Sequence, residues 1–97
     1  MNDHVIQSDP ELQRILFACL TYWQNESLPP ADREICHTWV CGTYQSRFGG
    51  TFHPSRLRRL AELGFLALSD TNARVRRYYT VPDPDHVRNL LQRCGLG

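Results

Sequence analysis

Residues 51–81 read TFHPSRLRRLAELGFLALSDTNARVRRYYTV, and two periodicities follow one another in this stretch. In its first half, apolar residues spaced by three and four fall on one face of a helix: Leu57, Leu60 and Ala61. Pro54 is tolerated only in the first turn of a helix, and Gly64 is a typical helix stop. The pattern therefore predicts a short amphipathic helix over residues 52–63.

The second half of the stretch changes to alternation. Residues 65–69 are apolar and short, and the next four residues, Asp-Thr-Asn-Ala, form a turn cluster. Residues 74–81 then alternate between two faces, with Arg74 and Arg76 on one face and Arg77 on the other, beside Val75 and Tyr79. This pattern predicts a hairpin over residues 65–81 whose second strand is half-buried and rich in arginine.

Positive charge is concentrated in the same part of the chain. The 97 residues carry eleven arginines, no lysine and ten acids, which gives a net charge of +1. Residues 47–77 hold seven of the arginines and two acids, whereas residues 1–46 hold two arginines and six acids. Codon usage in a GC-rich genome accounts for arginine in place of lysine, but it does not account for the clustering. Such a local excess is what contact with phosphate groups requires.

The order of helix, short strand, turn and arginine-rich strand resembles the recognition helix and wing of a winged helix-turn-helix. The residues that carry the resemblance are Leu57, Leu60, Gly64, Phe65, Leu66, Arg77, Tyr78 and Tyr79. They are similar to the core of winged-helix transcription regulators such as the ArsR, MarR and PadR families, whose basic hairpin often ends in Tyr-Tyr. The resemblance covers about a third of the chain and singles out no one family.

The N-terminal half predicts a core-packing helix over residues 9–25. Asp9, Pro10 and Glu11 provide an N-cap, a proline at the first helical position and an acid in the first turn. The expected buried face consists of Leu12, Ile15, Leu16, Cys19, Leu20 and Trp23. Residues 1–8 are expected to form an arm that is disordered or packs on a neighbouring molecule.

Two further helical regions complete the prediction. Residues 31–48 form one long helix or two short ones, with a buried side made by Ile35, Cys36, Trp39, Val40 and Tyr44. Residues 84–94 form a C-terminal helix after an Asp83 cap, and it either closes over the core or pairs with its copy in a dimer. The expected fold is a single domain over residues 1–97, α+β and mostly α, with three or four helices, a two-stranded wing and a C-terminal helix.

The resemblance implies sequence-specific binding of double-stranded DNA by a small transcriptional repressor that acts as a homodimer through its terminal helices. Helix 52–63 would enter the major groove, and the wing would lie on the backbone or in the minor groove. The expected DNA-binding residues are Arg47, Thr51, Ser55, Arg56, Arg58, Arg59, Arg74, Arg76 and Arg77. Among them, Ser55, Arg56 and Arg59 are expected to reach bases or phosphates, and Arg77 has the alternative of bracing the wing internally.

The four cysteines are expected to be reduced thiols, most of them buried, as in a cytoplasmic protein. Cys36, His37 and Cys41 suggest a metal site, but only His37 and Cys41 are one helical turn apart, and no second pair follows. No metal and no cofactor is therefore expected. His53 is expected to pack or cap at a helix boundary, and His37 and His86 are expected on the surface.

The sequence contains no recognisable motif for catalysis or for membrane insertion. It contains no triad pattern and no paired carboxylates, and Gly49-Gly50 lacks the Lys-Ser/Thr of a phosphate-binding loop. No segment approaches the ~20 apolar residues of a membrane span, and residues 1–13 do not resemble a signal peptide. We therefore expect a soluble, cytoplasmic protein without enzymatic activity.

Three alternatives to a DNA regulator stay open. The arginine-rich face can be solvated and bind nothing. The domain can be a protein–protein interaction module, for example a phage- or plasmid-encoded factor, in which Tyr78, Phe48 and Phe52 supply an apolar patch. It can also be a thiol- or metal-responsive regulator that uses Cys36, His37 and Cys41.

Overall fold

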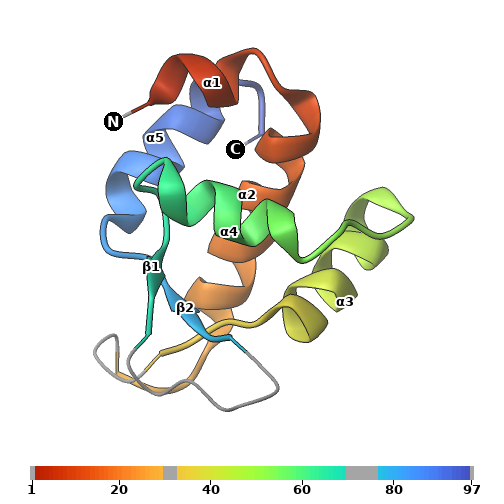
Figure 1. Cartoon of the computed structure of the whole chain (residues 1–97), viewed down its shortest axis with the longest axis vertical. Coiled ribbons are helices and arrows are strands. Elements are labelled where there is room, and N and C mark those ends of the chain that lie inside the picture. The colour runs from red at the N-terminus through yellow and green to blue at the C-terminus, as the bar shows by residue number, and fades with distance from the viewer. Residues whose placement is uncertain (1, 30–32, 70–76, 97) are drawn as a thin grey trace.

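The computed structural model describes residues 2–29, 33–69 and 77–96, and within these ranges it is α+β and mostly helical (Figure 1). In chain order the elements are α1 (Asp3–Gln7), α2 (Pro10–Asn25), α3 (His37–Phe48), α4 (Ser55–Glu62), β1 (Ala67–Leu68), β2 (Tyr79–Thr80) and α5 (Pro84–Arg93). The expected fold class is confirmed at this level. The two strands form one antiparallel sheet.

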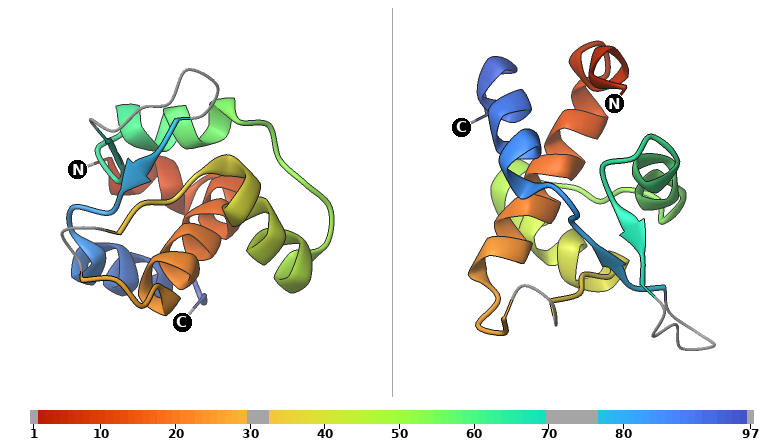
Figure 2. Two further views of the ribbon diagram at one scale, coloured as in Figure 1. Left: turned by 90° about the horizontal axis from the view of Figure 1, so that it is seen from below. Right: turned by 90° about the vertical axis from the view of Figure 1, so that its left-hand side faces the viewer.

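Helix α2 is the centre of the molecule and lies between α5 and α4 (Figure 2). Its N-terminus is the one that the sequence predicts, because the Asp9 carboxylate accepts a hydrogen bond from the Leu12 N–H at 3.2 Å and Pro10 is the first helical residue. The predicted apolar face is buried throughout: Leu12, Ile15, Leu16, Cys19, Leu20 and Trp23. Helices α1, α3, α4 and α5 all contact α2.

Residues 1–8 differ from the expected arm, because residues 3–7 form helix α1 and pack on the core. Ile6 is fully buried, and the Gln13 side-chain amide donates a hydrogen bond to the Ile6 carbonyl at 2.9 Å. Asp3 Oδ1 lies 2.9 Å from His86 Nε2 of α5. His86 is therefore half-buried rather than on the open surface as predicted.

The expected helical region over residues 31–48 is wrong in its first part. Residues 31 and 32 lie outside the described residues, and α3 begins only at His37. Before it, Ile35 forms an antiparallel bridge with Tyr79, and each residue donates its N–H to the carbonyl of the other at 2.8 Å. This exchange requires extended backbone and therefore excludes a helix at Ile35.

The hairpin β1–β2 follows α4 and joins the Ile35 segment through Tyr79. Ala67 pairs with Thr80 and Leu68 with Tyr79, and the Ser69 N–H continues the ladder to the Tyr78 carbonyl at 2.8 Å. The sheet thereby links the segment before α3 to the segment after α4. Residues 70–76, which include most of the expected turn, lie outside the described residues.

Helix α5 closes over the core, which is one of the two roles that its sequence left open. The Asp83 carboxylate caps it by accepting from the His86 N–H at 3.1 Å, as predicted. Its stripe of Val87, Leu90 and Leu91 is buried within the chain, where α5 contacts α2.

Candidate nucleic-acid interface

Helix α4 begins with a histidine cap. The exposed His53 ring accepts a hydrogen bond from the Ser55 N–H at Nδ1, 3.1 Å away, and the Ser55 hydroxyl lies 2.9 Å from the same nitrogen. This confirms the expectation of a boundary histidine that caps. The helix begins at Ser55, three residues later than predicted, while Phe52 before it is buried in the core.

The C-terminal end of α4 is a Schellman motif. Gly64 has a φ of +92°, which favours glycine because it has no Cβ. Its N–H donates to the Ala61 carbonyl at 3.1 Å, and the Phe65 N–H donates to the Leu60 carbonyl at 3.0 Å. The predicted stop at Gly64 is confirmed, and it fixes where the chain leaves α4 towards β1.

One face of α4 is anchored and the opposite face is free. Leu57 and Leu60 are buried as predicted. The exposed face consists of Ser55, Arg58, Arg59 and Glu62. Within the described part of the chain, neither Arg58 nor Arg59 forms an ion pair. Two guanidinium groups are thus held on a rigid helix with their donors open to an acceptor from outside.

Arg56 does not belong to this free face, although its position in the sequence suggested that it reads bases. Its Nε lies 2.8 Å from Glu11 Oε1 of α2, and the side chains of the two residues are 44% and 43% exposed. The pair lacks the alignment of a hydrogen bond, so Glu11 Oε1, which is shielded from solvent, has no hydrogen-bond partner in the described structure. Among the described residues Arg56 is the ion-pair partner of this carboxylate, and the pair links α4 to α2.

The remaining arginines are distributed over other elements. Arg74 and Arg76 lie outside the described residues. Arg77 is exposed just before β2, so it does not brace the inside of the hairpin. Arg47 is in the last turn of α3, and its guanidinium carbon lies 5.2 Å from the centroid of the Phe17 ring, a cation–π contact. Thr51 is exposed in the segment between α3 and α4.

The predicted metal candidates form a pair rather than a triad. His37 Nε2 lies 2.6 Å from the Phe52 carbonyl oxygen and 3.2 Å from Cys41 Sγ. A carbonyl only accepts, so Nε2 carries the proton and the ring clamps α3 to the segment before α4. His37 is consequently half-buried, against the expectation of a surface position. Among the described residues no group of three His, Cys, Asp or Glu side chains is placed to hold a metal ion.

The four cysteines are free thiols. Cys19 and Cys36 are buried, while Cys41 and Cys94 are half-buried. Complete burial raises the pKa of the Cys19 thiol far above its usual range, so this residue stays protonated at neutral pH and is a poor nucleophile.

An exposed aromatic cluster was missed by the sequence analysis, which placed Trp39 on the buried side of its helix. Trp39 is 37% exposed. Its ring stacks on Tyr22 of α2 with centroids 5.8 Å apart and is tilted against Tyr78 at 5.6 Å. Phe48 and Phe52, the other expected members of an apolar patch, pack instead around Tyr44 at 5.4 Å and 5.1 Å. The signal for the cluster was the pair of adjacent tyrosines at the hairpin, of which Tyr79 faces the core and Tyr78 faces Trp39.

Comparison with protein-family models, with curated proteins and with solved structures finds no match for this chain. In the described residues, no helix combines the length and the apolar character that a membrane crossing requires. The geometry of α4 and of the elements around it is therefore the basis on which a function can be inferred.

Proposed function

We propose that this chain is a winged-helix domain that binds double-stranded DNA in a sequence-specific manner. The observation that carries the proposal is the outer face of α4, where Arg58 and Arg59 are exposed, unpaired among the described residues and held by a buried leucine stripe. A rigid helix with free guanidinium groups is what recognition of phosphates and guanine edges needs.

The order of elements supports the winged-helix part of the proposal. The order of helix α3, a segment with Gly49 and Gly50 at φ values of +78° and +79°, and helix α4 is the order expected of a helix–turn–helix unit. The antiparallel hairpin follows α4 directly, and an isolated bridge joins Ile35 to its Tyr79 side. Recognition helix and wing would thus be adjacent in the chain and joined by the fixed exit at Gly64.

In the proposed complex, α4 enters the major groove with Ser55, Arg58 and Arg59 towards the DNA. Arg59 and Ser55 reach base edges or phosphates, and Arg58 contacts phosphate. The hairpin, whose connecting segment contains Arg74 and Arg76, follows the backbone or the minor groove, with Arg77 at its base. Arg56 acts as a positioning residue, because its pairing with Glu11 sets how α4 lies on α2.

We further propose that the protein is a small repressor and that it acts as a homodimer. A two-fold dimer would present two copies of α4 to half-sites about one helical turn of DNA apart. This part of the proposal rests on the resemblance to winged-helix regulators.

The decisive experiment measures binding of the purified chain to random duplex DNA and to DNA from its own upstream region across a salt series. We expect log Kobs to fall linearly with log salt, by about 0.9 per phosphate contact, together with a preference for one fragment. Negligible binding at low salt would remove the proposal. Salt-dependent binding without any preference would leave a non-specific DNA-binding domain.

A protein–protein interaction module is the second candidate, because one observation favours it. The Tyr22–Trp39–Tyr78 cluster lies beside the hairpin with Trp39 exposed and both tyrosines half-buried, and aromatic residues are enriched in protein interfaces. Partner binding through this cluster would be insensitive to salt and would be lost in a Trp39→Ala variant, whereas DNA binding through α4 would be retained in that variant.

A further inference from the structure

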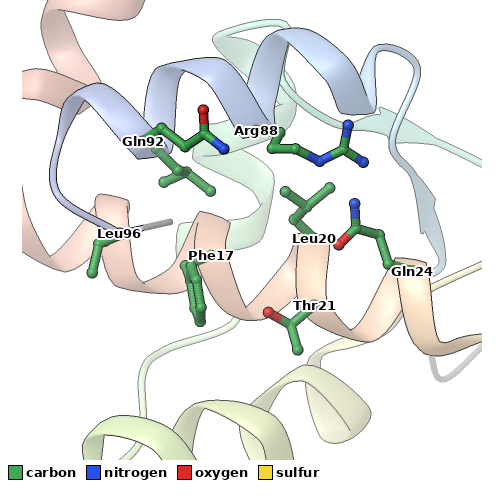
Figure 3. A pocket seen from close by; sticks show the side chains of 8 residues that line it. Phe17, Leu20, Thr21, Gln24, Arg88, Gln92 and Leu96 are labelled. Atoms are coloured by element: carbon green, nitrogen blue, oxygen red, sulfur yellow. The ribbon is translucent and has the colours of Figure 1, made fainter.

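A pocket of about 260 Å³ lies between α2 and α5 (Figure 3). Its apolar wall is formed by Phe17, Leu20, Leu91 and Leu96. At one end, the side chains of Gln24 and Arg88 approach one another from the two helices. The pocket therefore has an apolar body and a polar end.

The polar end presents hydrogen-bond donors. Figure 3 draws the Gln24 amide with its nitrogen towards Arg88, and exchanging the two amide atoms, which are alike in shape, satisfies both groups. The amide oxygen then accepts from Arg88 Nε at 3.3 Å and from a terminal nitrogen of the same guanidinium. The Gln24 N–H₂ group takes the place of the drawn oxygen, which points away from Arg88 (Figure 3). A guanidinium group and an amide N–H₂ both donate, so this end favours an acceptor.

Arg88 is held in place for such a role. Its Nη1 lies 2.8 Å from Asp85 Oδ1, one turn earlier on α5, while Gln24 holds its other edge from α2. The Arg88 side chain is 45% exposed and keeps access to solvent. A ligand carboxylate can therefore replace the neutral amide oxygen and form a charge-assisted hydrogen bond with the guanidinium group, which is stronger than a bond to a neutral acceptor.

We propose that this pocket binds a small monocarboxylate with an apolar tail, with the carboxylate at Arg88 and Gln24 and the tail against Leu20 and Leu91. The volume lies below the roughly 300–1,000 Å³ typical of sites for drug-sized ligands, which limits the tail to the size of a short alkyl chain or one ring. Because α2 lies between this pocket and α4, the proposal is independent of DNA binding (Figure 2).

A second copy of the chain fits the pocket less well. A stable protein interface buries about 800 Å² on each partner, whereas the stripes of α2 and α5 are already buried against each other here. What remains between them is a small hollow with an arginine at one end, and it matches a small anion better than a helix.

The test uses the full chain, labelled with ¹⁵N, titrated with hexanoate and benzoate and with the corresponding uncharged amides. We expect saturable shifts of amide signals from α2 and α5 with the carboxylates, and about tenfold weaker binding of hexanamide and benzamide. Arg88→Gln should weaken the carboxylates by about tenfold and leave the amides unchanged. Thr21→Phe, which fills the pocket from α2, should prevent binding of all four probes.

Arg14→Gln is the matched control, because Arg14 is an exposed arginine of α2 outside the pocket. If Arg14→Gln and Arg88→Gln weaken carboxylate binding equally, the weakening is due to the change in net charge and not to a contact in the pocket. That result would overturn the proposal. No saturable shift with any probe, or equal binding of acids and amides, would also overturn it. A dimer that Thr21→Phe converts to a monomer would assign the pocket to a second copy of the chain. If Thr21→Phe fails to fold, the comparison of Arg88→Gln with Arg14→Gln still decides.

Discussion

Helices α4 and α5 are alike in architecture and differ in how their arginines are paired. Both are short, both bury leucines on one side, and both end in a Schellman motif closed by a glycine. On α5, Arg88 pairs with Asp85, and Arg93 Nη2 lies 3.8 Å from Asp3 Oδ2. On α4, Arg58 and Arg59 have no acidic partner among the described residues. Helix α4 holds three arginines and α5 holds two, so the numbers are close, and the larger difference lies in their ion-pair partners.

The difference assigns the two helices different roles. Exposed ion pairs contribute little to stability, with a median of ~0–1 kcal/mol, so the pairs on α5 chiefly neutralise charge on a helix that closes the core. Arg58 and Arg59 leave a positive face on α4 that forms no ion pair within the described part of the chain. That face is therefore available for an anionic partner.

The largest expected effect tests whether the two helices are anchored alike. Leu60 of α4 and Leu90 of α5 are both fully buried. Leu60→Ala and Leu90→Ala should each lower the free energy of unfolding by about 2–5 kcal/mol, because each leaves a cavity in the same core. Urea denaturation followed by circular dichroism measures both. A decrease in the free energy of unfolding below about 1 kcal/mol in only one of the two variants would show that its helix is loosely attached. The arginine-bearing faces of α4 and α5 could then not be compared as parts of equally rigid helices.

The next effect concerns the outer faces themselves. Arg59→Ala should weaken specific DNA binding by about 1–3 kcal/mol if Arg59 contacts a guanine, and Arg58→Ala should reduce affinity for all sequences and lower the salt slope by about one phosphate. Fluorescence anisotropy with labelled duplexes at two salt concentrations measures both quantities.

Arg93→Ala on α5 is the control for these variants, since it removes the same charge from a helix on the other side of α2. Binding that falls equally in Arg93→Ala and Arg59→Ala would mean that overall charge, rather than the face of α4, attracts the DNA.

The glycines at the two helix ends should behave alike. Gly64 after α4 and Gly95 after α5 have φ values of +92° and +85°. Alanine at either position should cost about 1–2 kcal/mol of stability, because a Cβ is disfavoured in left-handed backbone. Gly42→Ala within α3 is the opposite control: beyond the adjacent residues and the nearby backbone of α3, no heavy atom of the described residues lies within 4 Å of the position of its Cβ, and the change should stabilise by roughly 0.5–1 kcal/mol. A neutral Gly64→Ala variant would indicate that the exit from α4 is not fixed in solution.

Local signals account for the parts of the fold that could be predicted. The Asp9 and Asp83 caps and the stop at Gly64 are each defined by a few adjacent residues, and all three are present in the structure. The buried stripes of α2 and α5 follow from helical spacing in the same way. The exposed positions of Ser55 and Arg59 could be predicted for this reason as well, since they lie opposite Leu57 and Leu60, whereas Arg56, expected on the same face, is half-buried.

The parts that could not be predicted depend on partners distant in sequence. Helix α1 is too short to be stable alone, and Ile6 and the Asp3–His86 contact anchor it to the core and to α5. The extended backbone at Ile35 is marked by one isolated bridge to Tyr79, and a single isoleucine fits a helical stripe equally well. Arg56 looked like Arg59 in the sequence, because nothing within α4 indicates that Glu11 lies beside one of them.

The smallest expected effect concerns the Arg56–Glu11 pair. Arg56 lies on α4, like the unpaired Arg58 and Arg59, but it is ion-paired, like the arginines of α5. A double-mutant cycle with Glu11→Gln and Arg56→Gln should give a coupling energy of about 0.2–1 kcal/mol, because both side chains are partly exposed. The double-mutant cycle is needed because Glu11 also interacts with the positive N-terminal end of α2. The stability change of Glu11→Gln alone would include the loss of this interaction as well as the loss of the ion pair with Arg56. Thermal or urea denaturation of the four proteins measures the coupling.

The same four proteins separate positioning from direct contact in DNA binding. If Arg56 positions α4 through Glu11, then Glu11→Gln and Arg56→Gln should change affinity in a non-additive way, and the second change should add little to the first. If Arg56 instead contacts DNA directly, Glu11→Gln should release it and strengthen binding, while Arg56→Gln weakens it as much as Arg59→Ala does. That second result would place Arg56 with the unpaired arginines of α4, and the Glu11 pair would then compete with DNA for its side chain.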